Sequence, residues 1–346
     1  MIHPKFSING KAFDSNALEN GELFPQELAS ILQNWMSDEK LMKLQSSGTT
    51  TGEPKPIYLE KSKMMASAQM TVQFLGLRAG DTAWLTLSPK YIGGLMMVVR
   101  AMITGMNLHV DGPDMDSLVA SKRPEQIDLG AMVPHQVMTL LERAPEKLRN
   151  IQNLLIGGGP VSGTLASDLK EVGGRVYSTF GMSETISHIA LKQINGADSQ
   201  AYYQTLPGIS IQSIGGCLSI KAPGLLEEEL LTRDRVEIHS PREFVWLGRS
   251  DFMINSGGVK IHPEKLEERL DNQLSCSFAF IGIPHSTLGQ QLVLVVEGDV
   301  PTHLDWSDFQ RYEIPKKVLS LSHFPRTDTG KIKRGVLQEI ILDQLK

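Results

Sequence analysis

The chain has 346 residues, of which 41% are hydrophobic and 21% charged, which is typical of a globular protein with two or three domains. Its formal net charge of −5 gives no reason to expect broad nucleic-acid binding. The longest apolar run, residues 92–106, is too short to span a bilayer and is interrupted by Arg100.

The N-terminus and the cysteines indicate the compartment. No apolar signal core follows residues 1–5, and Cys217 and Cys276 lie far apart and outside any CxxC motif. We therefore expect a cytoplasmic protein without a disulfide framework or a zinc site. Both cysteines are expected to be buried as small hydrophobic residues. A homo-oligomer is compatible with this sequence.

Helices and strands alternate through the first half of the chain. In order, the pattern predicts a helix over 62–76 capped by Ser62, a strand over 82–88, a buried helix over 93–104, a strand over 127–133, a helix over 135–142, a strand over 154–156, a helix over 165–172 and a strand over 175–179. Such alternation indicates a mainly parallel sheet, whose ligands gather beyond the carboxyl ends of the strands. Residues 157–160 and 180–184 are expected at those ends.

The pattern changes after residue 205. Short strands over 209–214, 217–222, 229–232, 235–239 and 244–247 predict a small β subdomain. A helix over 263–274, strands over 278–283 and 291–297, and a final helix over 335–345 predict a compact α+β unit. We expect an α/β protein with a large N-terminal domain over 1–248, a hinge over 249–251 and a small mobile C-terminal domain over 252–346.

The segment Ser46–Lys55, SSGTTTGEPK, is the strongest local signal. Its glycines let the backbone approach an anion, its hydroxyls add neutral donors, and its lysine adds a point charge. The segment therefore predicts a loop that wraps a polyphosphate. It is not a P-loop, which needs adjacent Gly-Lys-Ser/Thr, so a P-loop kinase is disfavoured.

Three further segments carry candidate functional residues: 178–185 (STFGMSET), 246–260 (WLGRSDFMINSGGVK) and 325–333 (PRTDTGKIK). In the first, an aromatic-Gly turn suits a planar base, and a nearby glutamate suits Mg²⁺. Each segment alone is modest evidence, because strand-turn-polar sequences are common and most lysines in turns are simply solvated. Together and in this order, from about residue 40 onward, the four segments resemble the acyl-adenylate-forming superfamily of acyl-CoA ligases, nonribosomal adenylation domains and luciferases.

The resemblance implies a role for each matching residue. It implies a phosphate loop of Ser47, Gly48, Thr49, Thr50, Thr51, Gly52 and Lys55, and an adenine and acyl pocket of Gly158, Gly159, Pro160, Thr179, Phe180, Gly181 and Ser183. It implies that Glu184 binds the metal, that Asp234 and Arg249 hold the ribose, and that Asp251 is the hinge. It further implies that Ser256, Gly257 and Gly258 meet CoA, and that Lys331 is the catalytic lysine of adenylation.

The implied reaction activates a carboxylic acid with ATP and Mg²⁺ to give an acyl-AMP, from which a thiolate such as that of CoA displaces AMP. Residues 254–264 and 179–185 most resemble the o-succinylbenzoate–CoA ligases of menaquinone biosynthesis. Another aryl- or acyl-CoA ligase, a stand-alone adenylation enzyme that loads a carrier protein, and a non-catalytic nucleotide-binding protein remain as alternatives. Retention of Glu184 and Lys331 disfavours the last.

Arg100 is the candidate contact for a second carboxylate on the acid. No acidic residue lies within four positions of it in an apolar helix, so either it binds such a carboxylate bidentately or it reaches water or a distant acid. Tyr91 is the candidate floor of the acyl pocket. His135 and His188 are better explained as hydrogen-bonded structural residues than as catalysts.

The short N-terminus departs from the family pattern. Only 45 residues precede the predicted phosphate loop, where most members have a long subdomain. Either that part is dispensable or a second subunit supplies the surface.

Overall fold

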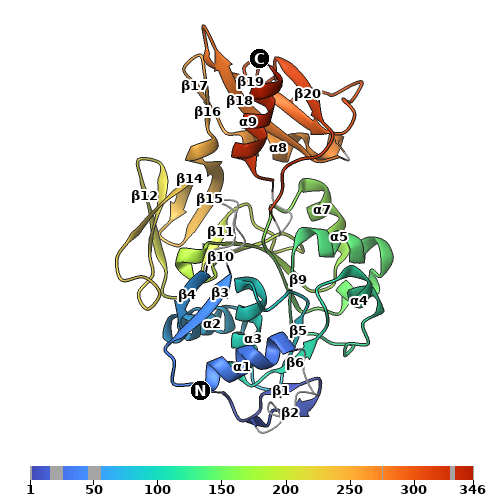
Figure 1. Ribbon diagram of the computed structural model, residues 1–346, viewed down its shortest axis with the longest axis vertical. Coiled ribbons are helices and arrows are strands. Elements are labelled where there is room, and N and C mark those ends of the chain that lie inside the picture. The colour runs from blue at the N-terminus through green and yellow to red at the C-terminus, as the bar shows by residue number, and fades with distance from the viewer. Residues whose placement is uncertain (1, 16–25, 46–55, 275, 328–331, 346) are drawn as a thin grey trace.

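A large twisted sheet runs through most of the molecule, and a smaller one caps it (Figure 1). The computed structural model describes residues 2–15, 26–45, 56–274, 276–327 and 332–345. Within these residues the large sheet has thirteen strands in the order β12-β13-β14-β15-β11-β10-β9-β8-β7-β5-β6-β1-β2. We call residues 2–249 the N-terminal unit and residues 254–345 the C-terminal unit.

The central strands of the large sheet are parallel. They are β1 (Ser7–Ile8), β5 (Thr82–Leu85), β6 (Asn107–Val110), β7 (Leu129–Met132), β8 (Asn153–Ile156) and β9 (Arg175–Gly181). Successive side chains of β5 enter different cores: Ala83 and Leu85 join one, and Trp84 joins the other. A strand that is apolar on both faces is expected where helices cover a parallel sheet on both sides. The predicted α/β class is confirmed.

Helices cover the two faces of the parallel strands. The first face carries α1 (Gln26–Met36), α2 (Lys61–Leu75) and α3 (Ile92–Thr104), together with the separate hairpin of β3 (Leu41–Gln45) and β4 (Pro56–Glu60). The second carries α4 (Met115–Ala120), α5 (Pro134–Arg143), α6 (Glu146–Arg149) and α7 (Gly163–Asp168).

Antiparallel strands extend the same sheet beyond β9. They are β10 (His188–Gln193), β11 (Tyr203–Thr205), β15 (Glu243–Arg249), β14 (Leu230–Ser240), β13 (Cys217–Lys221) and β12 (Ser210–Ile214), and at the opposite edge β2 (Lys11–Ala12) pairs with β1. The strands predicted over 229–232 and 235–239 are therefore one strand, β14. Asp234 lies inside it rather than in a turn.

The C-terminal unit has its own sheet of β16 (Ile254–Ser256), β17 (Val259–Ile261), β18 (Phe278–His285), β19 (Gly289–Glu297) and β20 (Lys317–Leu321). Helix α8 (Pro263–Leu270) covers one face of this sheet and α9 (Arg334–Gln344) the other. The amino end of α9 points toward the N-terminal unit, whereas the C-terminus of the chain lies at the far end of the molecule (Figure 1). Between the units, η4 (Ser250–Phe252) is a single 3₁₀ turn.

Several local predictions were wrong. Ser62 is not a helix cap, because α2 begins at Lys61 and follows Glu60, which makes no side-chain capping bond. The strand predicted over 82–88 ends at Leu85, and the helix predicted over 263–274 ends at Leu270 before a 3₁₀ turn, η5 (Asp271–Gln273). Cys217 and Cys276 are free but only half-buried.

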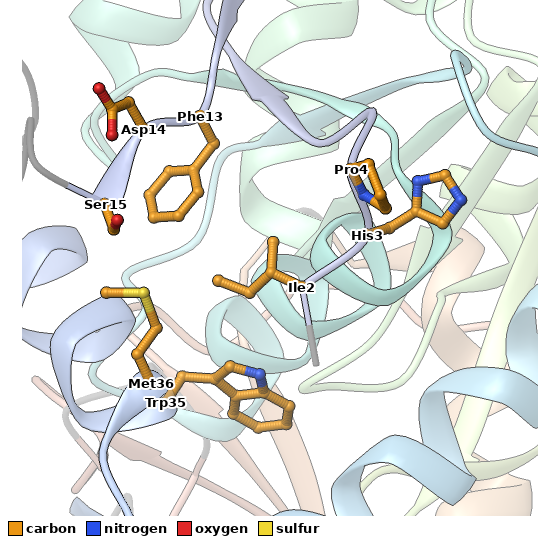
Figure 2. A pocket seen from close by; sticks show the side chains of 8 residues that line it. All are labelled: Ile2, His3, Pro4, Phe13, Asp14, Ser15, Trp35 and Met36. Carbon is orange, nitrogen blue, oxygen red and sulfur yellow. The ribbon is translucent and has the colours of Figure 1, made fainter.

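Two general features were compared with the expected site: membrane-spanning helices and the cavity near the N-terminus. Neither indicates a functional site. No helix among the described residues combines the length and apolarity needed to cross a bilayer. A cavity of about 550 Å³ is lined by residues that precede β1, follow β2 or end α1: Ile2, His3, Pro4, Phe13, Asp14, Ser15, Trp35 and Met36 (Figure 2). It therefore opens at the amino ends of the parallel strands, opposite to where α/β proteins bind ligands.

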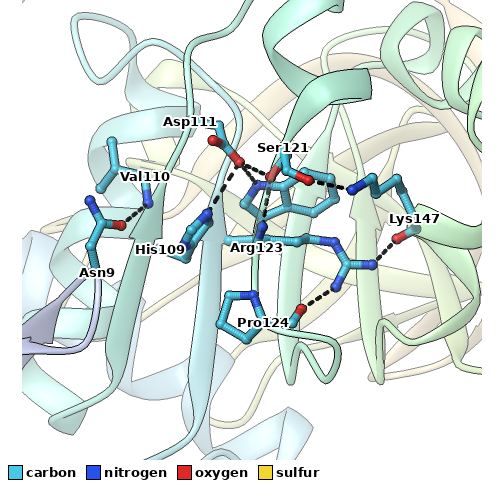
Figure 3. A network of polar contacts seen from close by, with 9 residues as sticks. Asn9, His109, Val110, Asp111, Ser121, Arg123, Pro124 and Lys147 are labelled. Atoms are coloured by element: carbon cyan, nitrogen blue, oxygen red, sulfur yellow. Dashed lines mark hydrogen bonds and ion pairs between the residues drawn. The ribbon is translucent and has the colours of Figure 1, made fainter.

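A half-buried carboxylate joins the helices of the second face to the sheet. Asp111, which follows β6, accepts hydrogen bonds from Trp84 Nε1 at 2.7 Å and from Ser121 Oγ, and lies 3.4 Å from His109 Nε2 (Figure 3). Burial alone would raise the pKa of Asp111, but the nearby His109 and the hydrogen bonds from Ser121 and Trp84 outweigh it and lower the pKa below its ordinary value. Asp111 thus fixes the ends of β5, β6 and α4 together.

We predict that Asp111→Asn lowers the free energy of unfolding at pH 7 by about 1–3 kcal/mol, because buried donors lose a charged acceptor. Since the pKa is depressed in the folded protein, this stabilisation is present above the unfolded-state pKa and is lost as the pH falls below about 4. Urea unfolding of wild type and variant across this range measures it. Asp116→Asn removes a carboxylate that is 87% exposed and should change stability by less than about 0.5 kcal/mol.

Candidate active site

The carboxyl ends of the parallel strands at the middle of the sheet are where this fold is expected to form a ligand-binding crevice. From β5 the chain passes through α3 to β6 on one side, whereas from β7 it passes through α5 and α6 to β8 on the other. Between β5 and β7 the strand order therefore changes direction, which is where open α/β sheets bind ligands. Thr86 Oγ1 donates to Ala131 O at 2.7 Å and Gln136 Nε2 donates to Thr86 O at 2.8 Å. These hydrogen bonds connect the end of β5 to β7 and α5 at this edge.

The loop of residues 157–160 lies at this edge, as predicted. Gly157 N–H donates to Met132 O at 3.0 Å, and Gly158 has a φ of +82°. A Cβ added at Gly157 would lie 2.6 Å from Thr179 Oγ1, so Thr179 packs directly against the loop. The structure thus brings together two predicted segments, Gly158–Pro160 and Thr179, that are separated in sequence.

Strand β9 is longer than predicted and includes Phe180 and Gly181. The ring of Phe180 packs against Tyr203 and Phe244 at centroid distances of 5.7 and 5.1 Å. After β9, Ser183 and Glu184 are exposed in a 3₁₀ turn, η3 (Ser183–Thr185). The Glu184 carboxylate is open to solvent at the carboxyl edge, and its hard oxygens fit a Mg²⁺ ion.

A second group of predicted residues lies where β14 pairs with β15. Asp234 and Arg249 are directly opposite in register, and Asp234 is buried with Trp246 Nε1 donating to its Oδ1 at 2.9 Å. One oxygen of this carboxylate is thus held by Trp246, a residue whose role the sequence did not reveal. A tryptophan within a predicted strand carries no signal of such a contact.

Asp251 is held between two arginines at the predicted hinge. Arg249 Nη2 lies 2.9 Å from Asp251 Oδ2, and Arg233 Nη1 lies 3.3 Å from Asp251 Oδ1. Burial would raise the pKa of Asp251, but these guanidinium groups outweigh it and lower the pKa. For Arg249, burial opposes the charge, yet Asp251, Asp234 and Glu264 raise its pKa overall.

Polar contacts join the C-terminal unit to the N-terminal unit. Thr164 Oγ1 on α7 donates to Asn272 Oδ1 at 2.8 Å and contacts Asp271 at 3.2 Å, and Arg249 N–H donates to Glu264 Oε1 at 3.4 Å. Burial raises the pKa of Glu264, whose Oε2 has no hydrogen-bond partner in the described part of the chain. Glu264 is a further residue that sequence reasoning missed, because only the fold brings α8 against β15.

The predicted CoA-contacting residues form a hairpin turn in the C-terminal unit. Gly257 and Gly258, with φ of +60° and +87°, join β16 to β17 in a two-residue turn that requires left-handed backbone at both positions. Strand β17 is the edge of its sheet, and Figure 1 places it away from β9. Ser256, Gly257 and Gly258 are therefore not brought to the crevice in this arrangement.

Arg100 is buried, with 2% of its surface exposed, in the middle of α3. Its Nη2 donates to Ser187 Oγ at 3.0 Å, its Nε has no hydrogen-bond partner, and no ion pair to Arg100 is found, within the described residues. Burial lowers its pKa to about 9. A long-range acid partner, which the sequence left open, is thus absent from the described chain.

Tyr91 caps the start of α3 and is half-buried. Arg100 lies nine positions after Tyr91, which is about 13 Å along the helix. Tyr91 and Arg100 therefore belong to different ends of α3.

The two histidines differ. His188 is buried, and its Nε2 lies 3.0 Å from Thr71 Oγ1, as expected for a hydrogen-bonded structural histidine. Burial and then the Arg100 guanidinium hold its pKa well below the ordinary value. His135 is exposed on α5.

Two predicted segments lie outside the described residues. They contain Ser47, Gly48, Thr49, Thr50, Thr51, Gly52 and Lys55 of the predicted phosphate loop, and Lys331. The flanks are defined: Gln45 pairs with Pro56 at the end of the β3–β4 hairpin, and Arg326 pairs with Ile332 just before α9.

Comparison with known proteins places this geometry in a family. A family model described as "AMP-binding enzyme" matches residues 7–213. The 2-succinylbenzoate–CoA ligase of Bacillus cereus is 28% identical over 355 aligned positions, which cover 92% of this chain and 73% of that protein.

Solved structures show the same fold. The acyl-CoA synthetase (AMP-forming)/AMP-acid ligase II-like protein of Dyadobacter fermentans superposes with a TM-score of 0.65 at 32% identity, and the match covers 95% of this chain and 99% of that one. The o-succinylbenzoate CoA synthetase of Bacillus subtilis in complex with ATP and magnesium gives a TM-score of 0.71 at 22% identity, covering 85% and 68%. The match with the Dyadobacter protein thus covers nearly the whole of both chains.

Proposed function

Because the chain belongs to the AMP-binding enzyme family, we propose a specific reaction for it: activation of o-succinylbenzoate by ATP and transfer of the acyl group to CoA, as in menaquinone biosynthesis. The family and its relatives establish the coarser statement, an AMP-forming acyl-CoA ligase that uses ATP, Mg²⁺ and CoA. The proposed products are o-succinylbenzoyl-CoA, AMP and diphosphate. A cytoplasmic location and homo-oligomerisation stay predictions.

In the proposed first half-reaction the carboxylate of the acid attacks the α-phosphate of ATP and diphosphate leaves. This step is useful because oxide is a poor leaving group and AMP a good one. Negative charge gathers at phosphorus, so we assign Lys331 and the loop containing Ser47–Gly52 and Lys55 to stabilise it. Glu184 would hold Mg²⁺, which supplies charge neutralisation on the phosphates.

We assign the nucleoside to the strand ends. Gly158, Gly159, Pro160, Thr179, Phe180, Gly181 and Ser183 are the proposed adenine and adenylate contacts, because the loop after β8 and the end of β9 meet there. Asp234 and Arg249 are the proposed ribose contacts. A buried carboxylate with one oxygen fixed by Trp246 leaves its other oxygen to accept from sugar hydroxyls.

In the proposed second half-reaction the C-terminal domain, residues 252–346, rotates about Asp251 and brings Ser256, Gly257 and Gly258 to the pantetheine of CoA. The two half-reactions need different groups beside the acyl carbon, which gives a reason for rotation. The polar contacts of Thr164 with Asn272 and of Arg249 with Glu264 support a separable boundary, because hydrogen bonds near the surface contribute little free energy.

The observation that carries the choice of acid is Arg100. The Arg100 side chain is 2% exposed and has no carboxylate partner among the described residues. Burying such a charge costs free energy unless an anionic ligand pairs with it. We assign it to the carboxylate of o-succinylbenzoate that is not activated, and Tyr91 to the acyl pocket. An acid with a single carboxylate would leave Arg100 unpaired.

Acid-dependent ATP–pyrophosphate exchange tests the proposal. Across a panel of acids, o-succinylbenzoate should give the highest kcat/KM and benzoate a far lower one. Free CoA should accept the acyl group in place of a holo carrier protein. Preference for benzoate, or transfer only to a carrier protein, would favour the alternative ligases instead.

We predict that Arg100→Met raises the KM for o-succinylbenzoate about 10- to 100-fold, the loss expected for a charge-assisted contact. The same variant should be as stable as wild type or more so, because it removes an uncompensated buried charge. Exchange kinetics and thermal unfolding measure the two effects. Arg143→Met, on the surface of α5, is the matched control. An unchanged KM for o-succinylbenzoate in Arg100→Met would contradict the assignment of Arg100 to the carboxylate that is not activated.

We predict that Lys331→Ala reduces ATP–pyrophosphate exchange about 10²- to 10³-fold, as when one transition-state donor is removed. Thioester formation from synthetic o-succinylbenzoyl-AMP should stay near the wild-type rate. Lys333→Ala, two residues away, controls for nearby charge. An equal loss in both half-reactions would contradict the role of Lys331.

A further inference from the structure

The backbone turn at Ile186 is strained in a way that its sequence does not explain. Ile186 has φ +67° and ψ −49°, and Ser187 N–H donates to Thr185 O at 2.7 Å, which is the rare γ-turn with a positive central φ. A β-branched residue is unfavourable there. Among the described residues only Asn9 is another non-glycine with positive φ, and Asn9 lies in the tight turn between β1 and β2.

The surrounding structure holds this turn in place. Ile186 is 4% exposed and belongs to the core of the first face. The hydroxyl of buried Thr185 lies 2.8 Å from Ser187 O and 3.0 Å from Met182 O. A Cβ at Gly181 would lie 2.4 Å from both Ser187 O and His188 Cα, so only glycine lets the chain return this closely to β9.

The turn directs two consecutive side chains to two different helices. Ser187 Oγ accepts from Arg100 Nη2 on α3 at 3.0 Å, and His188 Nε2 meets Thr71 Oγ1 on α2 at 3.0 Å. The hydrogen bond between His188 and Thr71 holds the imidazole ring against α2. Backbone strain that serves such an arrangement points to function.

The hydrogen-bond partner of Arg100 is a neutral hydroxyl and not a carboxylate. A serine hydroxyl orients a guanidinium but does not neutralise it, whereas an aspartate in its place would form an internal ion pair and compete with an anionic ligand. At the next position, burial and then the charge of Arg100 lower the pKa of His188 well below its ordinary value, so His188 adds no second positive charge. Arg100 therefore keeps a full charge and a defined orientation.

We propose that Ser187, set by the strained turn at Ile186, is a positioning residue that orients Arg100 for acids bearing a second carboxylate, and so helps to determine acid specificity. The inference rests on the proposed function, in which Arg100 receives that carboxylate. Because η3 places Glu184 three residues before Ser187, one short segment then links the proposed metal carboxylate to acid selection.

The test is steady-state ATP–pyrophosphate exchange with o-succinylbenzoate, varying the acid and ATP separately. Ser187→Ala should raise the KM for the acid about tenfold while kcat and the KM for ATP change less than about twofold, consistent with loss of one hydrogen bond to a charged group. Ser187→Thr, which keeps the hydroxyl, should restore most of the affinity. Ser213→Ala, at an exposed position of β12, is the matched control.

Ser187→Asp provides a second variant, since its carboxylate should pair with Arg100 and preserve the fold. It should raise the KM for o-succinylbenzoate more than 100-fold while thermal stability is kept or increased. Normal acid affinity in Ser187→Asp, or an equal rise in the KM for acid and ATP in Ser187→Ala, would overturn the positioning role.

The two proposals fail differently. If wild type activates o-succinylbenzoate and Ser187→Ala matches it in every parameter, only the positioning role is refuted. If wild type activates no acid with a second carboxylate, the proposed function is refuted and the role of Ser187 falls with it.

Discussion

Strand β9 is the constraint on which the candidate site depends. It pairs in parallel with β8 on one edge and antiparallel with β10 on the other, so the sheet changes from parallel to antiparallel pairing at this strand. The parallel edge sets the loop after β8 against Thr179, and the antiparallel edge forces the chain to reverse immediately after Gly181. That reversal exposes Glu184 and brings Ser187 to Arg100 within a few residues.

Asp111 and Arg100 are two charges removed from solvent to different degrees, and they differ in how the chain satisfies them. Asp111 receives hydrogen bonds from Trp84 and Ser121 and lies beside His109, so its charge is satisfied internally. Arg100 is more deeply buried, yet the described chain offers it one neutral hydroxyl. Since buried charges are normally paired, the first stabilises the fold, and the second is the charge to which we assign the second carboxylate of the acid.

The boundary between the two units has the chemistry of a separable contact. Each unit encloses its own apolar cores, and polar contacts of Thr164 with Asn272 and of Arg249 with Glu264 cross the boundary. Such polar groups can exchange partners with water at small net cost. The hairpin of Gly257 and Gly258 lies on the outer edge of its sheet in this arrangement, so its proposed meeting with CoA requires a rotation.

Periodicity determined the element types and their order, because an apolar run such as that of β5 or α3 must be buried wherever it lies. It also indicated the strand ends 157–160 and 180–184. It singled out Arg100, because a charged residue within an apolar helix can be recognised from the sequence alone. Sequence could not predict that β14 is one strand, that Trp246 holds Asp234, or that Glu264 meets Arg249, because these depend on strand register and on how α8 packs. Nor could it reveal the strained turn at Ile186: no local preference favours that backbone, and only the packing around Gly181 and Thr185 imposes it.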